Sequence, residues 1–370
     1  MRAGLYIHYP FCRAKCPYCH FYSLADRGDL HLDWWEGLKR EADRQAAEKL
    51  EIDTVYIGGG TPSLLHPDDL HALRELMAGR FWLEAVEWTL EANPGTHDEA
   101  FMRGWREAGV TRVSIGVQSF DDGTLRTLGR DYAAEEAREL FALCREAGFA
   151  SVSIDLMIGV PGETPKSAAT TLEETIRLAP DHVSLYLLEN VDGLPFEKTL
   201  ERAPVDEDVA ADIYRRCQTG LESAGLRQYE ISNFARPGRE CRHNLKYWRY
   251  EAFLGLGPSA CSHLGDKRWC NRRDLGEWAE ALSRGEAIHD ELVELTPDTS
   301  AMEALVFGLR LAEGVDLAAL RERCGVDLET KFAREIHELS EDGWLIREGS
   351  AIRIPPDRFL VSNHVFSRFV

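Results

Sequence analysis

Short apolar segments alternate with helix-length segments over the first half of this chain, and this alternation limits the possible folds most strongly. The strand candidates, rich in β-branched and aromatic residues, are 5–8, 54–57, 87–91, 112–117, 151–158 and 182–188. Helix candidates between or after them are 32–49, 67–79, 98–108, 133–147 and 165–178. Such alternation predicts parallel strands joined by helical crossovers. About six units are too few for a closed eightfold barrel, so we expect an α/β fold with a partial, open parallel β/α barrel.

The pattern divides the chain into a barrel domain at 1–235, a linker and barrel-closing region at 236–295, and a C-terminal domain at 296–370. The last part has helix candidates at 300–311, 316–324 and 328–342, then two strands at 344–347 and 351–354. Helices followed by a small hairpin predict a winged-helix-like domain. Basic residues are not clustered on its candidate recognition helix, so we expect it to pack or bind a partner rather than nucleic acid.

Charge and hydropathy exclude several classes of partner. The formal net charge of −20 disfavours non-specific binding to nucleic acid or anionic membrane. No apolar run is long enough to span a bilayer. The N-terminus leads directly into the first strand without a signal peptide, so we expect a cytoplasmic protein.

Three cysteines, Cys12, Cys16 and Cys19, share one short loop with the spacing C-x3-C-x2-C. Thiolates suit iron–sulfur clusters, and three protein ligands leave one iron of a cubane open, which points to S-adenosylmethionine chemistry. A structural zinc site with His20 as fourth ligand is the main alternative, although adjacent ligands at 19 and 20 are geometrically awkward. A disulfide is a weaker alternative. The other six cysteines are scattered, and we expect most to be inert small hydrophobic residues.

Polar residues near the carboxyl ends of the predicted strands indicate a binding site. The turn GGGTP at 58–62 closes the second strand, Glu91 and Gln118 end the next two, and Asp155 lies in the fifth. Ligands of parallel α/β sheets bind at this edge. Each residue alone would be read as a buried polar group satisfied by its neighbours; together they favour a site. Arg130 is either a partner for a carboxylate or a surface residue.

Six motifs identify a family resemblance: YIHYPFC at 6–12, the cysteine loop, GGGTPS at 58–63, EANP at 91–94, SIGVQSF at 114–120 and DLMIGVPG at 155–162. The chain resembles the radical S-adenosylmethionine (SAM) superfamily over nearly its whole length, in the branch of oxygen-independent coproporphyrinogen III oxidase and the heme chaperones. The resemblance implies that Cys12, Cys16 and Cys19 hold a [4Fe-4S] cluster. It also implies that a set of other residues binds SAM, with Tyr18 near the adenine and the glycine-rich backbone near the methionine: Tyr6, Tyr18, Gly59, Gly60, Thr61, Glu91, Gln118, Arg130 and Asp155.

Three features separate the two members of this branch. The oxidase carries a fourth cysteine where this chain has Phe21, and it has a long N-terminal extension that this chain lacks. The run HNLKYW at 243–248 matches the H-N-x-x-Y-W motif of the heme chaperones, which makes His243 the candidate axial heme ligand; without the family it would be read as a core histidine. One departure is His20, where the chaperones commonly have aspartate.

The resemblance therefore favours a heme chaperone that delivers heme to a recipient hemoprotein, with an electron donor such as a flavodoxin or ferredoxin. The alternatives are a coproporphyrinogen III oxidase (dehydrogenase) and another radical enzyme acting on a tetrapyrrole.

Overall fold

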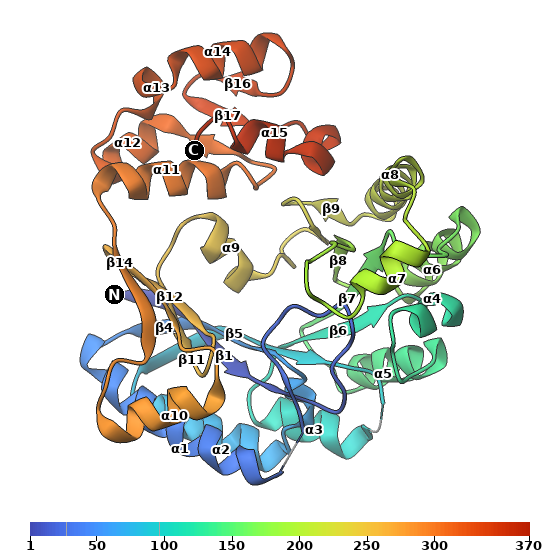
Figure 1. The fold of residues 1–370 in the computed structure, drawn as a ribbon, viewed down its shortest axis with the longest axis vertical. Helices are drawn as coiled ribbons and strands as arrows, with labels where there is room; N and C mark the ends of the chain where they lie inside the picture. The colour runs from blue at the N-terminus through green and yellow to red at the C-terminus, as the bar shows by residue number, and fades with distance from the viewer. Residues whose placement is uncertain (27, 96) are drawn as a thin grey trace.

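The computed structural model describes residues 1–26, 28–95 and 97–370, and its centre is a large, mostly parallel sheet (Figure 1). Within the described residues this sheet has twelve strands in the order β14-β13-β12-β11-β1-β4-β5-β6-β7-β8-β10-β9. Six of them form the predicted parallel series: β1 (Arg2–Tyr9), β4 (Glu51–Gly59), β5 (Trp82–Ala92), β6 (Arg112–Gln118), β7 (Ser151–Ile158) and β8 (His182–Leu187). The predicted α/β fold is thereby confirmed.

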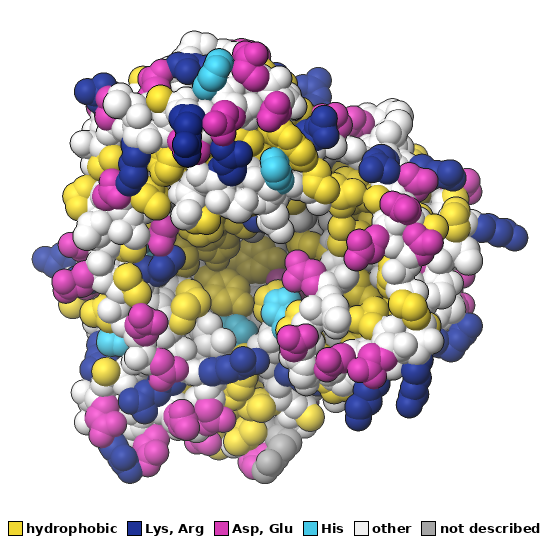
Figure 2. All heavy atoms as spheres, turned by 45° about the horizontal axis from the view of Figure 1, so that its top comes forward, with side chains coloured by type: hydrophobic (Ala, Val, Ile, Leu, Met, Phe, Trp, Pro, Cys, Tyr) yellow, Lys and Arg dark blue, Asp and Glu magenta, His cyan; other side chains and the backbone are white. Residues whose placement is uncertain are grey.

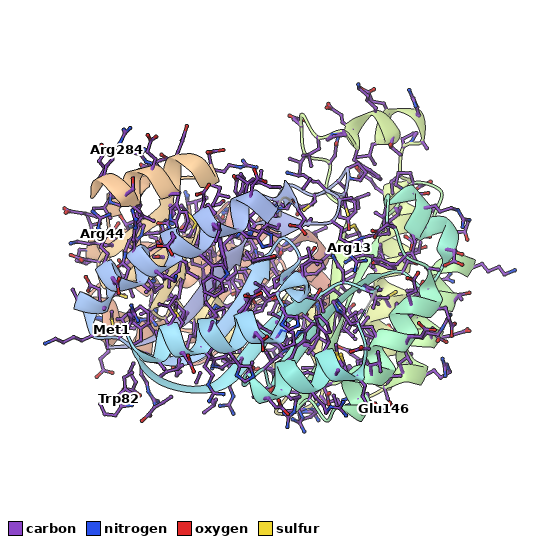
Figure 3. The ribbon with its side chains drawn as sticks, turned by 90° about the horizontal axis from the view of Figure 1, so that it is seen from below. Met1, Arg13, Arg44, Trp82, Glu146 and Arg284 are labelled. Atoms are coloured by element: carbon purple, nitrogen blue, oxygen red, sulfur yellow. A yellow bond between two sulfur atoms is a disulfide. The ribbon has the colours of Figure 1, made fainter. Side chains whose placement is uncertain are left out.

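Helices cover the outer face of these strands, as Figures 1 and 3 show. They are α1 (Gly28–Gln45), α2 (Pro67–Ala78), α3 (Glu99–Glu107), α4 (Asp122–Thr127), α5 (Ala134–Glu146), α6 (Pro165–Leu178) and α8 (Glu207–Ser223). The short helix α7 (Glu197–Arg202) lies apart from them, directly after Phe196, whose N–H donates to the Pro17 carbonyl at 3.2 Å. Side-chain caps such as Asp98 on α3 and Thr164 on α6 start several of them. Every residue of β6 is buried, as expected for a strand covered on both faces. One continuous hydrophobic core lies between sheet and helices.

Region 236–295 extends the sheet, where the sequence pattern indicated an irregular linker. After β9 (Arg227–Gln228), β10 (Asn233–Ala235) and α9 (Arg242–Trp248), β11 (Phe253–Leu256) pairs in parallel with β1. The antiparallel strands β12 (Cys261–Leu264), β13 (Lys267–Asn271) and β14 (His289–Glu294) complete that edge. These strands are short and partly exposed, so their apolar pattern is weak.

Helix α10 (Leu275–Arg284) fixes this added edge to the barrel by packing against α1 (Figure 3). Its Trp278 is fully buried, and a Cβ on Gly37 of α1 would lie 2.3 Å from the Trp278 ring. Only glycine allows this close approach. The Arg44 guanidinium of α1 also donates to the carbonyl oxygens of Glu286 and Gly285, at 2.7 and 3.2 Å.

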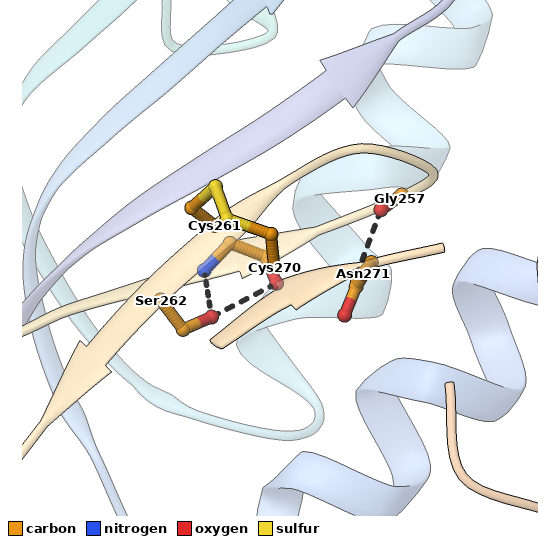
Figure 4. Close-up of a disulfide and its surroundings, with 6 residues drawn as sticks. Gly257, Cys261, Ser262, Cys270 and Asn271 are labelled. Atoms are coloured by element: carbon orange, nitrogen blue, oxygen red, sulfur yellow. Dashed lines mark hydrogen bonds between the residues drawn. A yellow bond between two sulfur atoms is a disulfide. The ribbon is translucent and has the colours of Figure 1, made fainter. Parts of the chain in front are cut away.

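Two cysteines differ from the prediction that the scattered thiols are inert. Cys261 and Cys270 are exposed, directly opposed on β12 and β13, and joined by a disulfide (Figure 4). The hairpin register brings them together, although they are nine residues apart in sequence. Cys144, Cys217 and Cys241 are free and buried, as small hydrophobic residues usually are.

The C-terminal segment has its own hydrophobic core of residues between 301 and 369. Its helices are α11 (Pro297–Gly308), α12 (Leu317–Cys324), α13 (Leu328–Lys331), α14 (Ala333–Glu341) and α15 (Asn363–Phe366). A small antiparallel sheet combines β15 (Val315–Asp316), β17 (Ala351–Arg353) and β16 (Ile346–Glu348). The predicted helix 328–342 is broken at Phe332, and β15 is additional to the predicted hairpin. In the described part of the chain, no helix combines the length and hydropathy needed to cross a membrane.

Candidate functional site

The cysteine loop begins where β2 (Phe11–Cys12) leaves the end of β1. Strand β2 pairs with β3 (Leu24–Ala25), so both ends of the loop are tied together. The Asp26 N–H donates to the Cys12 carbonyl at 2.7 Å, and the Cys19 N–H donates to the Cys16 carbonyl at 3.1 Å. The three thiols are thus presented from one anchored loop.

The surroundings of Cys12 and Cys19 shift the pKa of both thiols. Burial raises the pKa of Cys12, while the neighbouring Thr61 and Ser23 hydroxyls oppose the rise. Burial likewise raises the pKa of Cys19, which the Phe21 backbone and the Lys15 charge oppose. Bound iron would supply the positive charge that keeps both as thiolates.

The arrangement of the three thiols distinguishes between a zinc site and an iron–sulfur cluster. Among residues 1–26, 28–95 and 97–370, no three His, Cys, Asp or Glu side chains converge as they would around a single ion. Cubane ligands bind separate iron atoms and stand farther apart, so a soft, three-thiol donor set in one loop fits a cluster better than zinc.

The glycine-rich turn after β4 is packed directly against this loop. A Cβ on Gly60 would lie 2.5 Å from the Phe11 carbonyl oxygen, and one on Gly59, whose φ is +111°, would lie 2.5 Å from the His8 ring. The N–H groups of Gly60 and Thr61 donate to the Tyr9 and Phe11 carbonyls, at 2.7 and 2.8 Å. Within the backbone that the resemblance places near the methionine of SAM, these N–H groups are therefore already bonded inside the protein, which leaves carbonyls and side chains for a ligand.

A chain of polar contacts connects the turn with the cysteine loop. Asn93 donates to the Thr61 hydroxyl at 3.1 Å, and Arg130 donates to the Asn93 side-chain oxygen at 3.3 Å and to the Tyr18 hydroxyl. The Arg130 Nε is buried without a partner among the described residues. Tyr18 packs edge-on against Phe196, with ring centroids 6.1 Å apart. Thr61, Arg130 and Tyr18, predicted separately, thus belong to one network.

Gln118 joins the same group from the end of β6. Its φ is +62°, a left-handed conformation that costs a non-glycine residue energy and is common at functional sites. A Cβ on Gly116 would lie 2.7 Å from the Asn93 side-chain oxygen and 3.0 Å from the Gln118 amide nitrogen. Gly116 therefore makes room for both amides.

Glu91 and Asp155 place two buried carboxyl groups in the barrel interior. Glu91 accepts from the Tyr56 hydroxyl at 2.9 Å and from the Gly59 N–H at 3.1 Å, and burial raises the pKa of Glu91 to about 7. Asp155 accepts from the Ser114 hydroxyl at 3.1 Å, and burial raises the pKa of Asp155 as well. Buried carboxylates at this edge suit the amino and hydroxyl groups of a polar cofactor.

A cavity of about 270 Å³ lies beside these residues. Its lining joins predicted SAM residues to members of the H-N-x-x-Y-W motif, and it is rich in aromatic rings: Tyr6, Phe21, Tyr56, Gly59, Glu91, Asn244 and Tyr247. Figure 2 shows a hollow below the C-terminal domain with a hydrophobic floor and with histidine and acidic side chains at its edge.

The H-N-x-x-Y-W motif forms α9, whose start is held by a carboxylate from β5. The N–H groups of Arg242 and His243 donate to Glu87, at 3.1 and 3.0 Å. Negative charge at a helix N-terminus is stabilising. Helix α9 then directs Asn244 and Tyr247 to the cavity.

His243, the predicted axial ligand, has its ring engaged within the protein. Its side chain is buried, with 1% exposure, and its ring nitrogens pair with the Thr54 hydroxyl at 2.9 Å and the Tyr247 hydroxyl at 2.8 Å. Burial lowers the pKa of His243 to about 3. Both ring nitrogens are engaged within the protein, so coordination of iron by His243 would require breaking these hydrogen bonds, and its role as heme ligand stays a prediction.

Sequence reasoning did not assign Asn93 or Tyr56 to the site, used Phe21 only to separate the chaperones from the oxidase, and included Tyr247 only as part of the motif at 243–248. Asn93 lies within the EANP motif, and its polar side chain directly after a buried strand was the available signal. Tyr56 was hidden because an aromatic residue in a strand is most often core.

Comparisons with known proteins identify the family of this chain. The radical SAM superfamily model matches residues 6–175, and the HemN C-terminal domain model matches residues 295–357. The heme chaperone HemW of Bacillus subtilis is 30% identical over 372 residues, which cover 99% of this chain and 98% of that protein. HemW of Escherichia coli is 40% identical over 263 residues, 70% of this chain and 69% of that protein.

A solved structure supports the fold. Coproporphyrinogen III oxidase (HemN) from Escherichia coli superposes with a TM-score of 0.86 at 24% identity, covering 100% of this chain and 90% of that one. Together with the near full-length relatives, this shows that the chain belongs to the radical SAM superfamily, in its HemN-like family that contains the heme chaperone HemW.

Proposed function

We propose that this protein is a heme chaperone, which binds heme and passes it to a recipient hemoprotein. The cavity that joins the strand-end residues to α9 carries the proposal, because its aromatic walls suit a flat macrocycle. Relatives over nearly the full length are named heme chaperone HemW, which supports the same function.

The cluster and SAM would be held at the side of this cavity to which Tyr6, Gly59 and Glu91 of the predicted SAM set contribute. We propose that Cys12, Cys16 and Cys19 bind a [4Fe-4S] cluster, which, when bound with SAM, supplies an electron for reductive cleavage of the sulfonium. Gln118, Glu91 and the others of the predicted set would orient SAM, and the buried site would limit access of water. The chain's own contribution is a preformed frame, because Arg130 and Asn93 already connect the loop to the strand ends.

Phe21 favours the chaperone over the oxidase. It stands where the resemblance gives the oxidase a fourth cysteine, and its side chain is 57% exposed while lining the cavity. Its ring is therefore accessible to a ligand in the cavity. With Tyr247 and Asn244 opposite, it offers heme both apolar contact and a polar amide.

The test compares binding, transfer and turnover on one anaerobically reconstituted preparation. We expect saturable heme binding with a Soret band, transfer of that heme to an added apo-hemoprotein, and no porphyrinogen conversion. Conversion of coproporphyrinogen III to protoporphyrinogen IX would instead establish the oxidase. Modification of heme itself would favour a radical tetrapyrrole enzyme.

A flavodoxin or ferredoxin is the expected electron donor for the cluster.

The net charge of −20 disfavours non-specific adsorption of the protein to nucleic acid and anionic lipid.

A further inference from the structure

His20 is an exposed histidine at the end of the cysteine loop, directly before a cavity-lining residue. Its ring stacks on Phe21, with centroids 4.6 Å apart and an interplanar angle of 30°. His20 does not itself line the cavity that we assign to heme, but it adjoins the cavity through Phe21, which does.

The backbone around His20 is fixed although its ring is free. The His20 carbonyl accepts from Arg273 at 3.3 Å, and the Phe21 carbonyl accepts from Lys15 at 3.3 Å. Within the described residues, no hydrogen bond engages the ring nitrogens of His20. An imidazole of this kind can bind a metal without first losing a protein partner.

The other two histidines near the cavity have both ring nitrogens engaged. His8 is 3% exposed and pairs with the Tyr6 hydroxyl at 3.1 Å and the Tyr22 carbonyl at 2.9 Å. His243 pairs with Thr54 and Tyr247 in the same way. Coordination by either would require breaking buried hydrogen bonds and would leave their partners unsatisfied.

The remaining heme-ligand types around the cavity are also occupied. The hydroxyls of Tyr6 and Tyr247 are paired with histidines, and that of Tyr56 donates to Glu91. The loop cysteines are reserved for the cluster in the proposed function. Histidine, tyrosinate and thiolate are common protein ligands of heme iron, and of these His20 alone is both adjacent and unengaged among the described residues that we compared.

We propose that His20 supplies the axial nitrogen to heme iron, with the Phe21 ring packed against the macrocycle. This assignment rests on the proposed heme-binding function. It places heme directly beside the cluster loop and gives a chemical role to a residue that departs from the aspartate of the resembled chaperones.

The experiment titrates hemin into the reconstituted protein, its His20→Ala and His20→Gln variants, and a His337→Ala control at an exposed histidine of α14. We expect a histidine-ligated absorption spectrum for the native chain and the control. His20→Ala and His20→Gln should lose that spectrum and weaken hemin binding at least about tenfold, and added imidazole should restore it in His20→Ala. Iron, sulfide and SAM binding serve as the check that the loop is intact.

The outcomes separate the two proposals. A His20→Gln variant that keeps the native spectrum and affinity overturns the assignment of His20 while heme binding stands. A native chain that binds no hemin overturns the proposed function, and the assignment with it. If His20→Ala loses its cluster, the comparison is made between His20→Gln and the cluster-free native chain. The same heme-ligation spectrum in those two proteins again overturns the assignment.

Discussion

Replacement of His243 by alanine tests whether this residue belongs to the core or to heme. The change removes two buried hydrogen bonds, at 2.9 and 2.8 Å, and leaves the Thr54 and Tyr247 hydroxyls without their partner. Each lost bond with an unsatisfied partner costs about 1–3 kcal/mol, so we expect a loss of about 3–4 kcal/mol near neutral pH.

The stability lost through His243→Ala should be smaller at acidic pH, because the pKa of His243 is lower in the folded state than in the unfolded state. Burial lowers the pKa of His243 to about 3, so the folded state resists a proton that the unfolded state accepts. The stabilisation is therefore present above the unfolded pKa of about 6.5 and is lost as the pH falls. At about pH 5 the native chain would have lost about 2 kcal/mol through this residue, at about 1.36 kcal/mol per pKa unit.

The assay is urea unfolding of the native chain, His243→Ala and His337→Ala, followed by circular dichroism at about pH 7.5 and about pH 5. The stability difference caused by His243→Ala should fall from about 3–4 to about 1–2 kcal/mol, whereas His337→Ala should stay near zero at both. A His243→Ala variant of native stability that loses the histidine-ligated heme spectrum would refute the reasoning and restore His243 as the ligand.

Three further predictions concern the cluster and its frame. Alanine at any of the three loop cysteines should abolish iron–sulfur absorbance, whereas Cys144→Ala, at a buried free thiol, should retain about four irons per chain; stoichiometric zinc in the native chain would oppose this. Gln118→Ala should weaken SAM binding without loss of iron, measured by the response of the cluster's electron paramagnetic resonance spectrum; an unchanged response would place SAM elsewhere. Gly60→Ala should lower cluster loading because its Cβ would meet the Phe11 carbonyl at 2.5 Å, whereas Gly79→Ala, with 3.4 Å to its nearest atom, should not; equal loading would show that the loop adjusts.

The sequence predicted the parts of the fold that have strong periodicity. Fully buried strands such as β6 and regular amphipathic helices such as α5 carry their own signal. Strand β11 did not, since four residues are too few to show a clear period. The disulfide between Cys261 and Cys270 depends on a hairpin register that composition does not reveal.

The features of the site also divide into those that the sequence indicated and those that it did not. The cysteine spacing indicated a cluster. Polar residues near the ends of the predicted strands indicated Glu91, Gln118 and Asp155, because parallel strands end at one edge of a sheet. The motif around His243 does not reveal that the ring nitrogens of this histidine pair with the Thr54 and Tyr247 hydroxyls. The exposure of a histidine and the hydrogen bonds of its ring nitrogens distinguish a metal ligand from a core residue, and both depend on the tertiary structure.

The central claim is that heme binds in the cavity beside the cysteine loop, and hemin affinity of a matched pair of variants tests it most directly. Phe21→Asp places a charge in the cavity lining, whereas Leu32→Asp makes the same kind of change at a 71% exposed residue of α1 that does not line the cavity. We predict that Phe21→Asp weakens hemin binding at least about tenfold with cluster content unchanged, and that Leu32→Asp binds as the native chain does. Equal affinity of all three proteins would contradict the account.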